Sequence, residues 1–381
     1  METSTGIRIP VLPVTDGVIR SNDLFYGGAE PDWVDLNKVA IPQADEQQRL
    51  LRNIITSFSS QTVPLPQLWY FPTAAQKSVL VVTGDEHGQA SSVYTQYANI
   101  AASHGGHFTF YLSRYGQLSQ ATATTLKNQG HELGVHPYGH ADNQTLTQGY
   151  DFAINWFTNL GANNLGGYGT PSRTERNHQV EWQGWATAAN IARNHGMELS
   201  VDFYHWGSWL KNSSNQLVCS GYPTGSGQPT KFVDTNGTIY PIYQQVTQLV
   251  DEQMIVYADG APCAMSEAQA TTESKALIDR SLAGDYAAVT MQAHLDYGAT
   301  TWLDNITGYA QQQGMPIWTA ERWLDFTKAR QGATLAPLTW TAASTTLAFC
   351  ATTPSSEGTL TLMVPASYGA NAIGTITVDG T

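Results

Sequence analysis

The sequence predicts an α/β protein built from βαβ units around a parallel sheet or barrel. Through the centre of the chain, short apolar runs alternate with helical patterns. Several of these helical patterns end in glycine, the residue that most often follows a helix C-terminus. From about residue 333 the pattern changes to alternating runs without helices, which indicates a small β-rich appendage.

The apolar runs and the helical patterns can be given bounds in chain order. The runs that we interpret as strands are 78–84, 107–113, 131–136, 197–205, 287–295 and 315–320. The helical patterns between them are 91–105, 118–130, 150–162, 185–196, 266–284 and 302–314. In folds of this kind, functional residues gather where strands end and loops begin.

These patterns divide the chain into three segments. Residues 1–75 form a proline-rich, irregular N-terminal extension with one helical stretch at 45–58. Residues 76–330 hold the strand–helix alternation and form the predicted catalytic domain. Residues 331–381 form the β-rich C-terminal segment.

Composition narrows the class of partner. Only 13% of the 381 residues are charged, while 11 Trp and 18 Tyr provide aromatic faces that can stack on sugar rings or fill the core. The formal net charge of −13 excludes nucleic acid and anionic membrane surfaces as expected partners, since both call for clustered Lys and Arg. No run approaches the roughly 18 apolar residues that span a bilayer. We expect a monomer, and this composition is common among extracellular proteins that handle sugars.

The ends of the chain and its three cysteines bear on whether the protein is exported. The first residues, METSTGIRIP, lack the basic and apolar regions of a signal peptide. We nevertheless expect a secreted or cell-surface protein, with its signal peptide outside this sequence. The chain stops at ITVDGT, which we interpret as the middle of a strand and turn. Cys219, Cys263 and Cys350 fit no metal-binding spacing, and a Cys219–Cys263 bridge would leave one thiol over.

A first cluster of ionisable residues follows the apolar run at 79–82. Asp85, Glu86 and His87 stand in a row there, between the predicted strand and the next helix. Three such side chains cannot all be buried without partners, so they form either a site or a solvated turn.

A second cluster follows the predicted strand at 131–136. His136 and His140 are four residues apart, which puts both imidazoles on one face if this segment is a helical turn. That spacing suits two ligands of one metal ion, although it also occurs by chance. Together the clusters would supply two histidines and one carboxylate, a set that leaves metal positions open for water and substrate.

On these residues the chain resembles the polysaccharide deacetylases of the NodB-homology type, the fourth family of carbohydrate esterases, and a divergent bacterial secreted group among them. The family's Thr-Phe-Asp-Asp-Gly motif is matched by Thr83 to His87, and its His-containing motif by His136 to His140. The later motifs are matched by Arg176, with Arg173 as a weaker candidate, then Asp202 in VDFYHWGSW and His294 in VTMQAHLD. The resemblance runs from about 77 to 328 and implies a distorted (β/α) barrel.

The resemblance also implies a role for each matched residue. Glu86, His136 and His140 would hold Zn²⁺, or another divalent ion such as Co²⁺ or Ni²⁺. Asp85 would be the general base, paired with Arg176, and His294 the general acid, oriented by Asp202. An N–H near Tyr138 would bind the oxyanion. Tyr138, His87, Trp206 and Trp209 would contact the substrate, the two tryptophans as a wall for the acetyl methyl group.

Some of these residues have a second interpretation. Glu86 stands where the family has Asp, and His87, where Gly is usual, could be a fourth metal ligand, a group behind the ligands or a substrate contact. Asp202 could be a strand-end cap, and Trp206 and Trp209 plain core. The histidines at 131, 178 and 205 are expected to be structural.

The resemblance implies metal-dependent deacetylation of a carbohydrate, with an N-acetylated amino sugar polymer as the expected substrate. Two other functions use the same pattern. One is a catalytically inert carbohydrate-binding protein on this scaffold. The other is a metal-free glycosidase that uses two carboxylates on a barrel.

Overall fold

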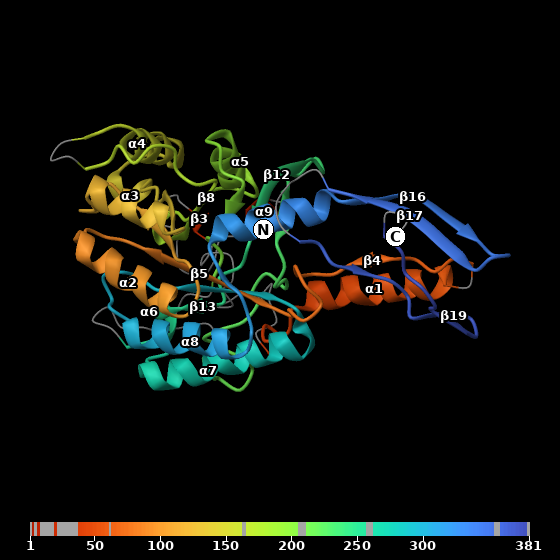
Figure 1. Cartoon of the computed structure of the whole chain (residues 1–381). Helices are drawn as coiled ribbons and strands as arrows, with labels where there is room; N and C mark the ends of the chain where they lie inside the picture. Colours follow the sequence, from red (N-terminus) through yellow and green to blue (C-terminus); the bar gives the residue numbers. More distant parts are fainter. Residues whose placement is uncertain are drawn as a thin grey trace.

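The structure is a computed structural model, and it describes residues 37–60, 62–161, 165–204, 211–256, 262–353 and 359–378. It also gives three two-residue strands near the N-terminus: β1 (Glu2–Thr3), β2 (Gly6–Ile7) and β3 (Ile19–Arg20). Strands occupy the centre of the molecule and helices surround them (Figure 1). The predicted α/β class is confirmed.

One sheet of ten strands organises the molecule. In spatial order it runs β11 (Thr230–Val233), β12 (Ile239–Gln244), β10 (Leu199–Ser200), β8 (Thr174–Glu175), β7 (Glu132–Val135), β6 (Thr109–Leu112), β5 (Val79–Asp85), β14 (Ala288–Gln292) and β13 (Leu249–Val250). The tenth strand, β15 (Ile317–Trp318), pairs with the first half of β5, at Leu80 and Val81. β6 pairs with the second half of β5, from Thr83 to Asp85. All neighbours are parallel except β11 and β12.

The segment between β12 and β13 curls this sheet into a distorted barrel. β12 lies near one end of the strand order and β13 at the other, yet only residues 245–248 separate them. Within this link, the N–H of Gln245 donates to the Ser200 carbonyl at 2.9 Å, on the β10 side. The N–H of Gln248 donates to the Thr290 carbonyl at 3.1 Å, on the β14 side. The predicted distorted (β/α) barrel is thus confirmed.

Helices cover the outside of the barrel. They are α2 (Ser91–Ser103), α3 (Gln120–Asn128), α4 (Leu146–Thr158), α5 (Thr187–Asn194), the four-residue α6 (Asp251–Met254), α7 (Glu267–Arg280) and α8 (Thr300–Gln312). A further helix, α9 (Ala320–Gly332), packs against the inner face of the sheet. Capping boxes fix the first turns of α4 and α7, at Thr145 with Gln148 and at Ser266 with Gln269.

Two buried clusters mark the two faces of the sheet. The outer cluster joins Leu80, Val82 and other strand residues to helices α2–α5, α7 and α8. The inner cluster joins Val79 and Val81 to Trp323 of α9, which crosses the middle of the molecule in Figure 1. Each strand therefore has one face toward the outer helices and one face toward the barrel interior.

The N-terminal and C-terminal segments meet beside the barrel. α1 (Gln43–Ser59) confirms the helix expected at 45–58, and β4 (Gln67–Leu68) pairs antiparallel with β18 (Leu362–Met363). The C-terminal segment forms the hairpin of β16 (Thr334–Thr341) and β17 (Thr346–Thr352), then β18, β19 (Ser367–Tyr368) and β20 (Asn371–Ala372). Figure 1 shows this hairpin extending from the barrel next to α1.

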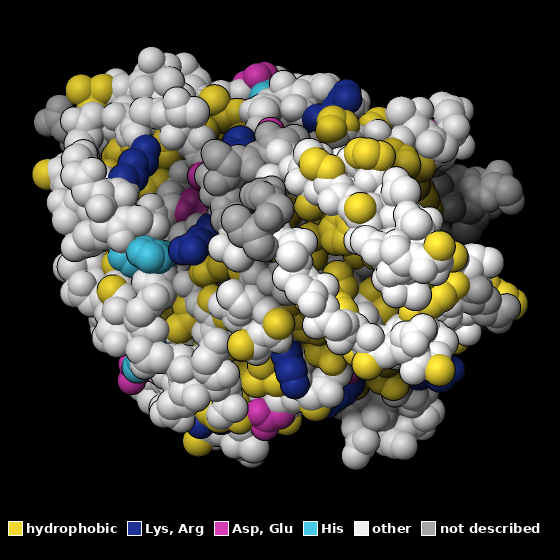
Figure 2. Space-filling view, turned by 45° about the vertical axis from the view of Figure 1, so that its right-hand side comes forward, with side chains coloured by type: hydrophobic (Ala, Val, Ile, Leu, Met, Phe, Trp, Pro, Cys, Tyr) yellow, Lys and Arg dark blue, Asp and Glu magenta, His cyan; other side chains and the backbone are white. Residues whose placement is uncertain are grey.

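The surface and the cysteines complete the description. Figure 2 shows few charged side chains on its face of the molecule, as the low charged fraction predicts. Cys219 and Cys263 form a disulfide, and Cys350 is an exposed free thiol. No helix in the described part of the chain is long and apolar enough to cross a membrane.

Candidate active site

The alternation of side chains along each strand decides which polar groups face the barrel interior. In β5, Val79 and Val81 lie in the inner cluster, and Leu80 and Val82 lie in the outer one. Asp85 continues the inner series, and so does His87, whereas Glu86 continues the outer series. The same rule places His136 after β7 and His294 after β14 on the inner side, at the carboxyl end of the barrel.

Asp85 lies at the centre of the inner group and is buried. Its Oδ2 accepts a hydrogen bond from Nε2 of Gln292 at 2.8 Å, and its Oδ1 lies 3.5 Å from Nη1 of Arg176. The predicted pairing of Arg176 with Asp85 is therefore present. Arg176 is fully buried and is fixed from behind by the Val201 carbonyl and the Thr247 hydroxyl, at 3.2 and 2.8 Å from Nη2.

His294 faces Asp85 across this group, with Nε2 3.8 Å from Asp85 Oδ2. Its Nδ1 is hydrogen-bonded to Asp251 at 2.6 Å, and its backbone N–H donates to the other oxygen of the same carboxylate. Burial alone lowers the pKa of His294, but the carboxylates of Asp251 and Glu252 outweigh burial and raise it to about 10. This pKa favours the protonated imidazole, whose Nε2 faces Asp85 and also lies 2.9 Å from the amide nitrogen of Gln292.

The carboxylate that orients His294 is Asp251, and this corrects the prediction for Asp202. Asp202 follows the outer face of β10, where it accepts hydrogen bonds from the N–H and the side-chain amide of Asn177 at 2.7 and 2.6 Å. It lies beside Glu175, another outer residue. Burial raises the pKa of Glu175 to about 7, and burial and Glu175 together raise the pKa of Asp202.

Glu86 is buried on the outer side of β5. Its Oε1 accepts hydrogen bonds from the N–H and the hydroxyl of Ser113, both at 2.6 Å, and its Oε2 accepts from the N–H of Gly88 at 2.9 Å. Burial raises the pKa of Glu86, and the hydrogen bonds from Ser113 and Gly88 oppose that rise. A Cβ at Gly116 would lie 2.7 Å from this carboxylate, so the pocket fits closely around it.

The segment between His136 and His140 is not a helical turn. Residues 136–139 are irregular, and the short 3-10 helix begins only at His140. The backbone N–H of His140 donates to Glu181. The expectation that the four-residue spacing puts both rings on one helical face is therefore wrong. The three predicted metal ligands have different neighbours: Glu86 is bound to Ser113, His136 to the Arg176 carbonyl, and the backbone of His140 to Glu181.

Four histidines instead gather at the carboxyl end of the barrel. The ring of His87 lies 5.4 Å from the rings of His136 and His178 and 5.5 Å from that of His294. Burial and His87 lower the pKa of His136, and burial with His136 and His87 lowers that of His178 to about 2. His136 and His178 are therefore neutral. His178 is a member of the site and not the purely structural residue that we expected.

The predicted substrate contacts are placed in part. Tyr138 stacks on His178 with ring centres 3.8 Å apart, and the side chain of His87 is partly exposed. Both lie in the histidine group and can reach a ligand there. Trp206 and Trp209 lie outside the described residues, as does the histidine at 205.

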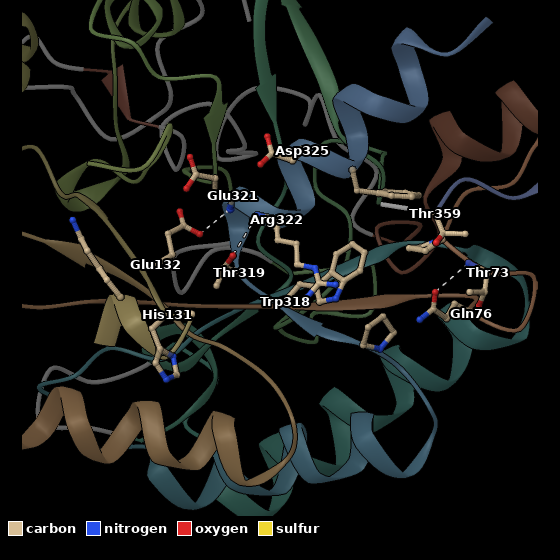
Figure 3. A pocket seen from close by; sticks show the side chains of 15 residues that line it. Thr73, Gln76, His131, Glu132, Trp318, Thr319, Glu321, Arg322, Asp325 and Thr359 are labelled. Carbon is tan, nitrogen blue, oxygen red and sulfur yellow. Dashed lines mark hydrogen bonds between the residues drawn. The ribbon is translucent and has the colours of Figure 1, made fainter. Parts of the chain in front are cut away.

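Arg173, the weaker candidate, is excluded from this site. Its guanidinium binds Glu321 and Asp325 of α9, at 2.9 and 2.5 Å. Those acids line a cavity of about 740 Å³ near the amino end of β7, where Figure 3 shows Glu132 on one side and Gln76 on the other. His136 follows the opposite end of the same strand, so this cavity is separate from the histidine group.

Sequence reasoning missed Asp251, Glu252 and Gln292. The first two follow Leu249 and Val250 just as Asp85 and Glu86 follow the apolar run of β5, so the signal was present in a strand too short to notice. Gln292 stands two residues before His294, on the same face of β14. Its amide nitrogen lies within 2.9 Å of both Asp85 Oδ2 and His294 Nε2.

The predicted metal ligands do not fit one ion. In the described part of the chain, no group of three His, Cys, Asp or Glu side chains is arranged to hold a metal ion as the side chains stand. Both Glu86 oxygens already accept hydrogen bonds on the outer face. The structure does bring Asp85 and His294 together, and each is held by its own buried partner, Arg176 or Asp251.

Several solved structures are similar to this chain. A candidate polysaccharide deacetylase from Mycobacterium smegmatis has 13% identity and a TM-score of 0.47, over 73% of this chain and 98% of its own. A family 4 carbohydrate esterase from Streptomyces lividans has 12% identity and a TM-score of 0.36, over 63% and 91%. An esterase of the same family from Streptococcus mutans has 15% identity and a TM-score of 0.38, over 64% and 87%.

At these identities the likeness concerns the fold. No family model matches the sequence, and no curated protein matches it.

Proposed function

We propose that this chain hydrolyses acetyl groups from an acetylated carbohydrate, with the N-acetyl group of an amino sugar polymer as the expected substrate. The observation that carries the proposal is the pairing of Asp85 and His294 on the inner face of the barrel, at 3.8 Å. Hydrolysis of an amide or ester needs a base for the water and an acid for the leaving group, and these two residues meet both needs.

In the proposed reaction, a water molecule enters between the two residues. Asp85 takes a proton from this water as its oxygen bonds to the acetyl carbon, and Arg176 and Gln292 hold the carboxylate in place. The Nε2–H of His294 then gives its proton to the leaving amine or alkoxide as the carbon–nitrogen or carbon–oxygen bond breaks. The products are acetate and a free amine or hydroxyl.

The tetrahedral intermediate carries a negative oxygen, and we assign its binding to a backbone N–H near Tyr138. Tyr138 is proposed to contact the sugar, since it borders the inner group. The zinc dependence predicted from the sequence would require ligands other than Glu86 and His140.

We further propose that the protein is exported. The Cys219–Cys263 disulfide supports this, because such bonds persist in oxidising compartments. A polymeric acetylated glycan would also be met outside the cell.

Acetate release from a panel of acetylated glycans tests the function. N-acetylated amino sugar oligomers and O-acetylated xylan are incubated with the protein, and acetate and new reducing ends are measured together. We expect acetate without new reducing ends. New reducing ends without acetate would establish a glycosidase, and binding without either product would establish an inert carbohydrate-binding protein.

A further inference from the structure

The three rings of His87, His136 and His178 form a nearly equilateral triangle. Their centres are 5.4, 5.4 and 5.5 Å apart. An ion that binds imidazole nitrogens at about 2.0–2.1 Å places each ring centre about 3 Å away, so tetrahedral ligands have ring centres about 5 Å apart. The triangle therefore has the size of three imidazoles around one ion.

At two of these rings, Nδ1 makes a hydrogen bond to an oxygen, and the lone pair is therefore on Nε2. His136 donates from Nδ1 to the Arg176 carbonyl at 2.7 Å, which leaves the lone pair on Nε2. His87 donates from Nδ1 to the Asp296 carboxylate, at 3.1 Å from the nearer oxygen, which likewise leaves Nε2. A carbonyl or carboxylate on the far nitrogen is the usual support of a metal-binding histidine.

Two nitrogens of the triangle are buried without a hydrogen-bond partner among the described residues. They are Nε2 of His136, whose side chain is 1% exposed, and Nδ1 of His178. A buried nitrogen without a partner costs about 1–3 kcal/mol, so its presence calls for an occupant. A divalent cation with open coordination positions is an occupant that imidazole nitrogens can bind.

The chain alternation explains why the third ligand is not Glu86. Asp85 is the last residue of β5 and faces inward, and His87 follows it into the inner group, whereas Glu86 between them is bound to Ser113 and Gly88 on the outer side. His87 thus stands where the resemblance placed an acidic ligand. His178 enters from the segment after β8 and takes the place predicted for His140.

We propose that His87, His136 and His178 bind one divalent metal ion, for which three imidazoles favour Zn²⁺ or Co²⁺. The rings need to turn about their side-chain bonds, because their nitrogens do not converge as they stand. Three protein ligands leave a coordination position for water. The ion would lie beside Asp85, within the site of the proposed function. Its test measures metal binding and not turnover, so either proposal can fail without the other.

The test is a titration of the chelator-treated full chain with Co²⁺, followed by its visible absorption, and then competition with Zn²⁺. We expect one equivalent to bind with the spectrum of a four- or five-coordinate ion. His178→Phe keeps the ring stacked on Tyr138 but removes both nitrogens, and should weaken binding on the order of 100-fold or more. His87→Gln, at the more exposed corner, should weaken it similarly.

Glu86→Gln and His140→Gln are the matched controls. Each should leave Co²⁺ affinity within about threefold of the wild type, since neither residue is in the triangle. A cooperative thermal transition verifies that each variant is folded, and His87→Gln serves if His178→Phe does not fold. The proposal is overturned if the wild type binds no Co²⁺. It is also overturned if Glu86→Gln or His140→Gln abolishes binding while the triangle variants retain it.

Discussion

At the scale of single residues, the period of two along each strand decides the chemistry. Asp85 and His294 meet because both fall on inner positions at the ends of neighbouring strands, β5 and β14. The same period turns Glu86 and Asp202 outward, where each is bound by backbone and side-chain donors. The resemblance to known motifs singled out Asp85, His294 and Arg176, but a motif does not specify which side of a strand each residue faces.

A comparison of two aspartates tests this assignment of roles. Asp251→Asn should lower kcat by about 10²–10⁴-fold, because an amide cannot hold the imidazolium of His294. Asp202→Asn should have a much smaller effect, since its partner is Asn177. The measurement is kcat for acetate release, with thermal unfolding as the control. If kcat fell equally in the two variants, or more in Asp202→Asn, the sequence-based prediction that Asp202 orients His294 would be restored.

The pH dependence of kcat gives a second test of the same pair. His294 acts as an acid only while protonated, and its carboxylate neighbours raise its pKa to about 10. The rate should therefore fall as the pH rises through about 10. In Asp251→Asn the residual rate should fall at lower pH, because the group that raises the pKa is gone. A falling limb at the same pH in both proteins would show that His294 is not the acid.

At the scale of elements, β6 and β7 depend on a neutral histidine between them. The Phe108 N–H donates to Nδ1 of His131 at 3.0 Å, so this nitrogen must stay unprotonated. Burial, with His107 nearby, lowers the pKa of His131 to about 4, against about 6.5 in an unfolded chain. As the pH falls from 6.5 toward 4, the unfolded chain takes up a proton that the folded chain does not, and stability is lost.

His131→Asn offers an amide oxygen to the same N–H but cannot titrate. Its free energy of unfolding should therefore fall less between pH 7 and pH 4.5, by about 2 kcal/mol relative to the wild type. Urea unfolding at the two pH values measures this difference, which is independent of any change that the substitution makes at pH 7. If His131→Asn lost as much stability as the wild type between pH 7 and pH 4.5, groups other than His131 would be responsible for the acid sensitivity.

The predicted elements differ in how well the sequence could locate them. Long amphipathic patterns such as those of α2 and α8, and fully buried runs such as β5, were found nearly at their observed bounds. β8 and β13 have two residues each, too few for a hydrophobic period to be recognised. Tertiary pairing alone defines such strands. The stretch after His136 was wrongly taken as helical because a four-residue spacing does not by itself specify φ and ψ.

At the scale of the whole molecule, residues 245–248 hold the two ends of the sheet together. The Gln248 side chain acts there as a short piece of strand. Its Oε1 accepts from the Thr290 N–H at 2.6 Å, and its Nε2 donates to the Ala288 carbonyl at 2.9 Å. Gln248 is buried, so no solvent can replace these bonds.

Gln248→Leu should destabilise the fold by about 1–3 kcal/mol, because it removes the side-chain acceptor of the buried Thr290 N–H, whereas the Ala288 carbonyl keeps a bond from Gln245. Gln312→Leu, on an exposed position of α8, is the matched control and should change stability by less than about 0.5 kcal/mol. Denaturant midpoints of the two variants provide the comparison. A neutral Gln248→Leu would show that the barrel does not depend on this link.

The general architecture could be predicted from the sequence because alternating strands and helices allow few arrangements. The closing link could not, since its contacts join residues about 40 apart through side-chain amides that follow no period. The same holds for the site: Asp85 and His294 lie on recognisable motifs, whereas Asp251 and His178 follow strands of two residues and Gln292 belongs to no motif.

The most direct test of the central claim is acetate release by Asp85→Asn. This variant is nearly isosteric, and its amide can still contact Arg176 or Gln292, so folding and glycan binding should persist. We predict that the wild type releases acetate from an N-acetylated amino sugar oligomer and that the variant binds the same oligomer but is slower by at least about 10³-fold. Acetate release by Asp85→Asn at the wild-type rate would contradict the account.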